Sequence, residues 1–134
     1  TFKKLNAYLD MDFLKNYTGL SGAVNILEND NERRNIMEKK EIAELFMKGI
    51  DCSQVVVGAF AEELGITTEE AYKMSAAFGG GMGLGETCGA VVGAMIVLGL
   101  KYGHCDVEHM GQKDIMNAKR AEFLQKFQEK YCCL

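Results

Sequence analysis

Apolar residues recur with a helical period along almost the whole chain. Ile42, Leu45 and Phe46 fall on one face of a helix, whereas charged residues occupy the opposite face. This spacing predicts an amphipathic helix that ends at Gly49. No segment shows the period-2 alternation of a half-buried strand, and the chain contains no proline. The pattern therefore predicts an all-α fold, a compact multi-helix bundle.

A capping pattern marks the start of the second predicted helix. Asp51 is followed three residues later by Gln54, the spacing at which an N-cap residue and the third helical residue bond each other's backbone amides. An apolar run follows and stops at Gly65, a typical helix-ending residue. The pattern predicts one helix from Cys52 to Gly65, with Cys52 at its first position.

The same pattern recurs before a glycine-rich loop. Thr67 and Glu70 have the capping spacing, and they start a helix that we expect to end where the loop begins. Five of the seven residues from Gly79 to Gly85 are glycines. Thr87 is the best N-cap for the apolar run from Cys88 to Leu100, which places Cys88 at the first helical position. The loop is therefore predicted to lie between two helices and to present Cys88 at a helix start.

The two ends of the chain differ in their patterning. A final helix is predicted from about Lys113 to Tyr131, because apolar residues again share one face. The first 36 residues have a weaker pattern, and Met37 is a candidate internal start. We therefore expect an N-terminal helical extension over residues 1–36, either non-native or loosely attached, and a helical domain over residues 37–134.

The glycine loop matches neither of two phosphate-binding motifs. A G-x-G-x-x-G fingerprint requires a third glycine, but the sixth positions counted from the first, third and fourth glycines hold Leu84, Glu86 and Cys88. No Gly-Lys-Ser or Gly-Lys-Thr occurs, which excludes a P-loop. A nest of backbone amides for an anion stays open, although Glu86 would repel an anion. The candidate cofactor-binding residues are Gly79, Gly80, Gly81 and Gly89.

Charge and hydropathy exclude two classes of partner. The net charge is −4 and the pI is about 5.2, which argues against nucleic acid as a partner. The apolar run from Cys88 to Leu100 is shorter than the roughly 18 residues of a spanning helix, so we expect no membrane insertion. The start of the chain lacks the basic stretch and apolar segment of a secretory signal, and we therefore expect a cytoplasmic protein.

Small residues recur at a spacing of four in the same apolar run. Gly89 and Gly93 are one such pair, and Ala90 and Ala94 are the other. This spacing allows a second helix to approach closely. The second helix belongs either to the same subunit or to the partner in a homodimer.

Five cysteines are present, and a chain of this length does not need disulfides to fold. In a reducing compartment cysteines are metal-binding, catalytic or inert. Cys52 and Cys88 are both predicted at helix starts, where free amides and the helix dipole stabilise a thiolate. Asp51 and Glu86 oppose this effect. The alternative is that both thiols are small buried hydrophobic groups.

The remaining cysteines give weaker signals. Cys132 and Cys133 are adjacent, and such pairs bind soft metals, form exchangeable disulfides or have no role. His104, Cys105 and His109 match no closed zinc motif, so a surface turn is the better interpretation. A metal or cluster site would need thiols far apart in sequence, and the candidate ligands are Cys52, Cys88, Cys132 and Cys133.

The order of these motifs resembles the C_GCAxxG_C_C family of bacterial proteins. The resemblance rests on D-C-S-Q at 51–54, F-G-G-G-M at 78–82, C-G-A-x-x-G-A at 88–94 and L-G-L-K-Y-G at 98–103. It covers roughly Met37 to the C-terminus. Cys52 matches the first family cysteine and Cys88 the second, and Cys132 or Cys133 is expected to match the third. The sequence stops at Leu134, before the expected place of the fourth.

The resemblance implies a helical, redox-active protein that cycles thiols and a disulfide or holds an iron–sulfur cluster or other metal. It also implies a redox partner or a transporter-associated role. Cys52 and Cys88 would be the redox thiols, together with Cys132 or Cys133, and whether the protein is an enzyme stays open. The alternative is a non-catalytic helical binding module with structural cysteines, whose apolar pocket would be lined by Phe78, Met74, Met82 and Met95.

Overall fold

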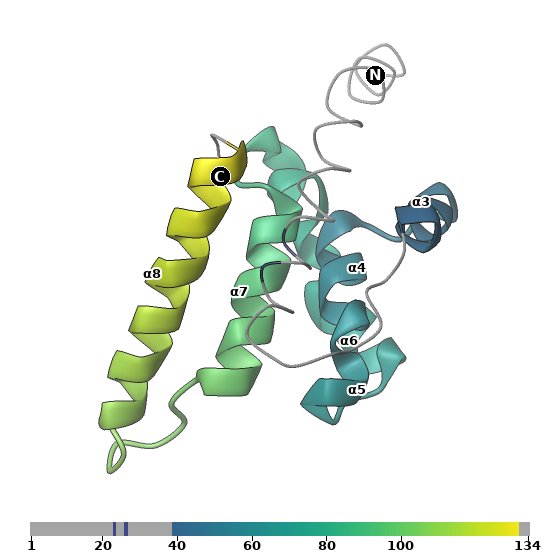
Figure 1. Ribbon diagram of the computed structural model, residues 1–134. Coiled ribbons are helices and arrows are strands. Elements are labelled where there is room, and N and C mark those ends of the chain that lie inside the picture. The colour runs from purple at the N-terminus through teal and green to yellow at the C-terminus, as the bar shows by residue number, and fades with distance from the viewer. Residues whose placement is uncertain (1–22, 24–25, 27–38, 132–134) are drawn as a thin grey trace.

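The computed structural model describes residues 23, 26 and 39–131, and between residues 39 and 131 it contains six α-helices (Figure 1). These are α3 (Lys39–Met47), α4 (Cys52–Ala59), α5 (Ala61–Leu64), α6 (Thr68–Ser75), α7 (Gly89–Tyr102) and α8 (Gly111–Tyr131). A 3₁₀ turn, η2 (Ala76–Phe78), and a π-type turn, η3 (Gly81–Gly85), lie between α6 and α7. No strand occurs among the described residues, which confirms the all-α prediction.

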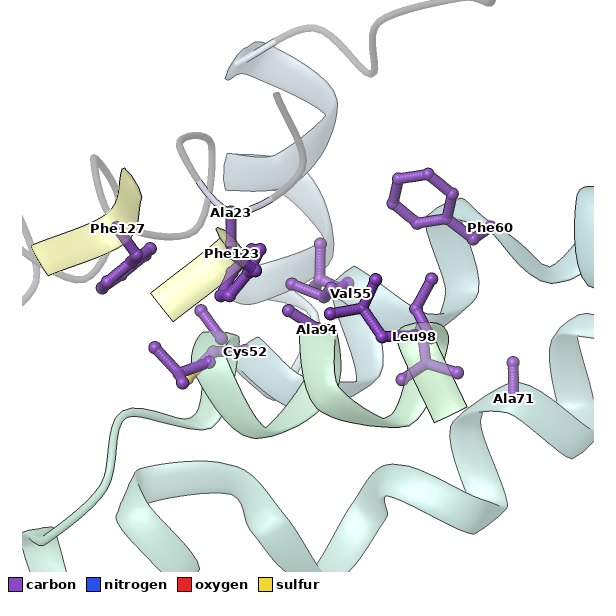
Figure 2. Close-up of a cluster of buried hydrophobic side chains, with 14 of the residues drawn as sticks. Ala23, Cys52, Val55, Phe60, Ala71, Ala94, Leu98, Phe123 and Phe127 are labelled. Atoms are coloured by element: carbon purple, nitrogen blue, oxygen red, sulfur yellow. The ribbon is translucent and has the colours of Figure 1, made fainter. Parts of the chain in front are cut away.

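Helix α4 is the centre of the bundle. It packs most extensively on α7 and next on α6, and α8 packs on α7 (Figure 1). Val55, Val56 and Val57 are completely buried along α4. Figure 2 shows Cys52 in the same apolar cluster as Ala94 of α7, with side chains of α8 nearby. A buried hydrophobic cluster of this kind supplies most of the stability of a small helical domain.

The α4–α7 contact depends on glycines that remove the side chain between the helices. A methyl group at Gly93 would lie 2.9 Å from the carbonyl oxygen of Ser53 and 3.0 Å from Cβ of Val56. Ala90 and Ala94, on the same helix, are completely buried. The small residues therefore pack within the subunit and offer no surface to a second copy. The homodimer stays a prediction without support from this contact.

The capping prediction for α6 is confirmed. Thr67 is the N-cap, and its Oγ1 accepts the Glu70 N–H at 3.1 Å while Glu70 Oε2 accepts the Thr67 N–H at 2.8 Å. At the start of α4, Asp51 is the N-cap and donates its N–H to Gln54 Oε1 at 2.9 Å. Both helices therefore begin where the sequence predicts.

Several predicted helix boundaries are wrong in detail. The helix expected from residue 52 to 65 breaks at Phe60, whose φ of −106° and ψ of 4° separate α4 from α5. The helix expected to reach the glycine loop ends at Ser75, where the chain tightens into η2. The first helix ends at Met47, and Gly49 lies in the following turn with a φ of +91°.

Ala23 lies in the region predicted to be an N-terminal extension. It is completely buried in the hydrophobic cluster, and Ile26 packs against the same cluster. These two residues therefore contribute to the core. The boundary near residue 36 stays a prediction. In the described part of the chain, every helix is too short or too polar to cross a membrane.

Candidate functional site

Cys52 is the first residue of α4 and is buried, with 5% of its surface exposed. Burial raises the pKa of the Cys52 thiol, because a thiolate loses its hydration in the core. The backbone N–H groups of Gly80 and of Cys52 itself act in the opposite direction, since they stabilise the thiolate. The net pKa is above the ordinary value, so the helix start alone does not make Cys52 a thiolate at neutral pH.

Cys88 is half-buried and is the N-cap of α7. The prediction that it is the first helical residue, with Thr87 as the N-cap, is wrong by one position. Cys88 has extended backbone angles, φ −56° and ψ 127°, and its carbonyl already accepts the N–H groups of Val91 and Val92. As the N-cap, Cys88 is still next to the free amides at the start of the helix, although its side chain accepts no hydrogen bond from them.

The structure brings these two thiols to one place. A methyl group at Gly89, the residue after Cys88, would lie 3.3 Å from the Cys52 sulfur. After burial, the charge of Cys88 is a further influence that raises the pKa of Cys52, so the two side chains lie close enough to interact electrostatically. Neither cysteine forms a disulfide in this structure. Cys52 and Cys88 are therefore a pair of free thiols at the adjoining N-terminal ends of α4 and α7.

The glycine loop covers this end of the bundle with an unusual backbone. Gly80, Gly81, Met82 and Gly83 have φ values of 62°, 63°, 59° and 71° and form a left-handed turn. Glycine adopts this conformation without strain, whereas Met82 does so at a cost of about 1 kcal/mol. The turn folds the chain back so that the Gly80 amide faces the Cys52 sulfur.

Three candidate cofactor-binding glycines have contacts within the protein. Gly81 is buried, and a methyl group there would lie 2.6 Å from the backbone nitrogen of Glu86. Gly89 packs against the Cys52 sulfur, and Gly79 leaves room for the side chain of Asp51. Packing therefore accounts for these glycines, and a role in binding a cofactor stays a prediction.

The sequence does not predict that the carboxyl group of Asp51 packs on the glycine loop. A methyl group at Gly79 would lie 2.5 Å from Cγ and 2.6 Å from Oδ2 of Asp51. The sequence placed Asp51 beside Cys52, but the fold of the loop decides where its side chain lies. The contact between Gly80 and Cys52 was missed for the same reason. The five glycines predict a tightly turned backbone, but they do not predict that this backbone contacts Asp51 and Cys52.

Cys105 lies far from the paired thiols. It is exposed and follows the C-terminal end of α7, whereas Cys88 is at the other end. A 14-residue helix separates them, a length of about 21 Å. In the same turn, Nδ1 of His109 lies 2.8 Å from Oδ1 of Asp106, and the Asp106 pKa is lowered by this contact and the His109 backbone N–H. This agrees with the prediction of a surface turn.

Cys132 and Cys133 lie outside the described residues. The last described residue, Tyr131, packs against Phe127 with a ring separation of 4.8 Å. Helices α7 and α8 run antiparallel, so α8 ends at the same end of the bundle at which α7 begins (Figure 1). The chain therefore leaves the described part of the structure at the end that carries Cys88.

The described residues do not form a metal centre by themselves. Among them, no group of three or more His, Cys, Asp or Glu side chains is arranged to hold a metal ion. A structural zinc site or an iron–sulfur cluster takes four protein ligands in its common forms, whereas this end of the bundle offers the thiols of Cys52 and Cys88. A metal site here would need further ligands from outside the described residues.

The predicted pocket of a binding module gains no support. Met74 and Met82, two of its expected lining residues, are 38% and 44% exposed. Met95 is half-buried and packs against the hydrophobic cluster, and Phe78 belongs to η2. Two of the four expected lining residues are therefore exposed, and the pocket stays a prediction.

Comparison with known proteins identifies the family. Residues 50–134, more than half of the chain, match the model of the C_GCAxxG_C_C family, described as "Putative redox-active protein". Neither the curated proteins nor the solved structures give a match. The matched range contains Cys52, Cys88 and the glycine loop, and it confirms the resemblance found in the sequence. The chain therefore belongs to the C_GCAxxG_C_C family.

Proposed function

We propose that this protein is a thiol–disulfide redox protein whose reactive pair is Cys52 and Cys88. One observation carries the proposal. Two free cysteines that are distant in sequence lie at the adjoining N-terminal ends of two packed helices, close enough for Cys88 to be among the groups that raise the pKa of Cys52. A structural role for two small buried hydrophobic groups would not require this pairing.

The two thiols differ in accessibility, and this difference sets their order of reaction. Cys88 is half-buried, so of the two thiols it is the one more accessible to an external disulfide. Cys52 is buried, and burial raises its pKa, which keeps it protonated at neutral pH. Thiol–disulfide exchange requires access and a thiolate. We therefore assign the attack on the external disulfide to Cys88 and the second, intramolecular step to Cys52.

The exchange balances without a cofactor. The Cys88 thiolate attacks one sulfur of an external disulfide, forms a mixed disulfide and releases the other half as a thiolate. The Cys52 thiol then loses its proton to solvent and attacks the Cys88 sulfur. This second step forms the Cys52–Cys88 disulfide and releases the remaining half as a thiolate. The protein loses two electrons and the external disulfide gains two.

The Gly80 amide supports the second step. When Cys52 deprotonates, the backbone N–H groups of Gly80 and Cys52 stabilise the developing charge. The same fixed amides lie at a buried sulfur, where a hydrogen bond to a charged group is stronger than in water. The glycine loop is therefore a part of the proposed reaction site.

Iron–sulfur or other metal binding needs more than this pair. Residues outside the described part of the chain, with Cys132 and Cys133 as the candidate thiols, would have to supply further ligands, whereas the thiol–disulfide reaction needs only Cys52 and Cys88. For this reason we place dithiol exchange first. A third thiol from residues 132–133 would serve as a relay from the pair to a redox partner, because α8 ends at the same end of the bundle.

Single-cysteine variants test the proposal. The background is a protein with Cys105, Cys132 and Cys133 replaced by serine, which leaves only the proposed pair. In this background Cys52→Ser should accumulate a stable mixed disulfide at Cys88 when treated with hydroxyethyl disulfide. Cys88→Ser should react much more slowly, since only the buried thiol remains. Mass spectrometry after acid quenching measures both products.

Two results would argue against the proposal. One is equal mixed-disulfide formation in the two variants, which would remove the assigned order. The other is failure of the paired protein to form an internal disulfide under conditions that oxidise it. Iron, sulfide and zinc analysis of the full chain purified anaerobically gives the control, because stoichiometric metal bound through Cys52 and Cys88 would favour the metal-binding alternative.

A further inference from the structure

The carboxyl group of Asp51 lies at the exposed edge of the thiol pair. Asp51 is exposed and directly precedes Cys52. A methyl group at Gly79 would lie within 2.6 Å of its Cβ, Cγ and Oδ2, so the side chain extends across the backbone of Gly79. The next residue, Gly80, supplies the amide that faces the Cys52 sulfur. The carboxylate therefore lies between the start of α4 and the loop that covers Cys52.

Two elements hold this carboxylate in position. The Asp51 backbone is fixed as the N-cap of α4, and its N–H donates to Gln54 Oε1 at 2.9 Å. On the other side, the missing side chain of Gly79 creates the space that Asp51 occupies. Because its backbone is fixed and its side chain packs on Gly79, the carboxylate stays at one position relative to a bound partner. The charge of a freely rotating surface side chain has no such fixed position.

Helix α4 and residues 76–88 carry no lysine, arginine or histidine, and the nearest positive charge along the chain is Lys48, an exposed residue three positions before Asp51. Glu86 is exposed, lies two residues before Cys88, and adds a second negative charge on the loop. The lysine of the neighbouring α6, Lys73, pairs with Glu69 of its own helix at 2.5 Å. The lysine of α7, Lys101, pairs with Glu63 at the far end of that helix.

We propose that Asp51 determines the specificity of the thiol pair by disfavouring negatively charged partners. The substrates would then be neutral or positively charged disulfides, including the exposed cystine of a protein with a basic surface. This inference rests on the proposed function of Cys52 and Cys88. Disulfide exchange brings the substituents of the partner to within several ångströms of the attacked sulfur, and there they are repelled or attracted by the carboxylate.

Coulomb's law gives the size of the effect. If a charged substituent of the partner comes to about 7 Å from the carboxylate in water, one charge changes the rate constant by about threefold. A change from a negative to a positive substituent therefore changes the rate by about sevenfold. The same carboxylate also affects the ionisation of Cys52, but that effect is common to every partner and cancels in a ratio of two rate constants.

The experiment compares disulfides that differ in charge. Cystamine is the positive probe, hydroxyethyl disulfide the neutral one and dithiodiglycolate the negative one. Stopped-flow oxidation of the reduced protein that has only Cys52 and Cys88 gives the three rate constants. Each is divided by the rate constant of the same disulfide with a simple uncharged thiol, which removes the differences in intrinsic reactivity among the disulfides. We expect the cystamine-to-dithiodiglycolate ratio to fall about sevenfold in Asp51→Asn at low salt, and less at high salt.

The variants are chosen to separate charge from structure. Asn is as good an N-cap as Asp, so Asp51→Asn removes the charge and keeps the helix start. Glu62→Gln removes one exposed carboxylate from α5, and it should leave the ratio unchanged. An unchanged ratio in Asp51→Asn, with exchange still active, would overturn the inference.

A second reaction distinguishes failure of the inference from failure of the proposed function. Iodoacetate is negative and iodoacetamide is neutral, and both alkylate Cys88 without any disulfide chemistry. Asp51→Asn should raise the iodoacetate-to-iodoacetamide rate ratio about threefold. If this ratio rises but no disulfide reacts, the proposed function and the substrate class are refuted. If exchange proceeds but neither ratio changes, only the role of Asp51 is refuted.

Discussion

Replacing Gly93 with alanine tests the close contact of α4 and α7 that brings the thiols together. The new methyl group would lie 2.9 Å from the Ser53 carbonyl oxygen and 3.0 Å from Cβ of Val56. The oxygen belongs to the backbone of α4, so the helices must separate slightly. Overpacking of this kind costs about 1–3 kcal/mol, and the better helix propensity of alanine offsets about 1 kcal/mol.

Gly99→Ala is the matched control for this variant. Gly99 lies in the same helix, and a methyl group there would meet no atom within 4 Å. It should therefore stabilise the protein by about 0.5–1 kcal/mol through propensity alone. The propensity gain is common to both variants, so the difference between them, about 1–3 kcal/mol, isolates the overpacking.

Urea denaturation followed by circular dichroism measures both free energies of unfolding. The reduced protein is used, so that no disulfide contributes. We expect Gly93→Ala to unfold at a lower urea concentration than Gly99→Ala, with a similar slope. Equal midpoints for the two variants would refute the close approach of α4 and α7 at Ser53, and with it the argument that this contact positions Cys52 beside Cys88.

Three further predictions concern the loop, the thiol and a helix cap. Met82→Gly should raise the free energy of unfolding by about 1 kcal/mol in urea denaturation, because Met82 has a φ of +59° and its side chain is not part of the buried core. Folding raises the pKa of Cys52, mainly because the thiol is buried. The protonated thiol therefore contributes fully to the free energy of unfolding below the unfolded-state pKa of about 9, and this contribution is lost as the pH rises through the folded-state pKa. In urea denaturation at several pH values, Cys52→Ala should therefore lose less stability than the parent as the pH rises above about 9. Thr67→Ala removes the side-chain cap of α6 and should cost about 1 kcal/mol in thermal or urea unfolding, whereas Thr67→Ser should cost little.

Local signals in the sequence were enough to predict where helices begin. The Thr67 and Glu70 pair satisfies backbone amides within four residues, so its effect is visible in the sequence itself. Cys52 is at its predicted position for the same reason. Cys88 was placed one residue too far into its helix, because Thr87 is a better N-cap by residue type. In the structure the returning glycine turn sets the backbone there, and this tertiary constraint overrides the local preference.

The arrangement of the site depended on contacts that the sequence does not encode locally. The left-handed turn from Gly80 to Gly83 requires glycines, but their composition alone does not say that the Gly80 amide reaches Cys52. The break at Phe60 is similarly invisible, since the apolar period continues through it. The small residues of α7 predicted a close helix neighbour, and only the fold identifies that neighbour as α4.

The most direct test of the central claim is peptide mapping of the oxidised full chain without reduction. Diamide oxidises the reduced protein, remaining thiols are alkylated with iodoacetamide, and mass spectrometry identifies the linked peptides. The account predicts a peptide pair joined through Cys52 and Cys88, reversible by dithiothreitol, with Cys105 alkylated. Full alkylation of both Cys52 and Cys88 after oxidation of the chain would contradict it.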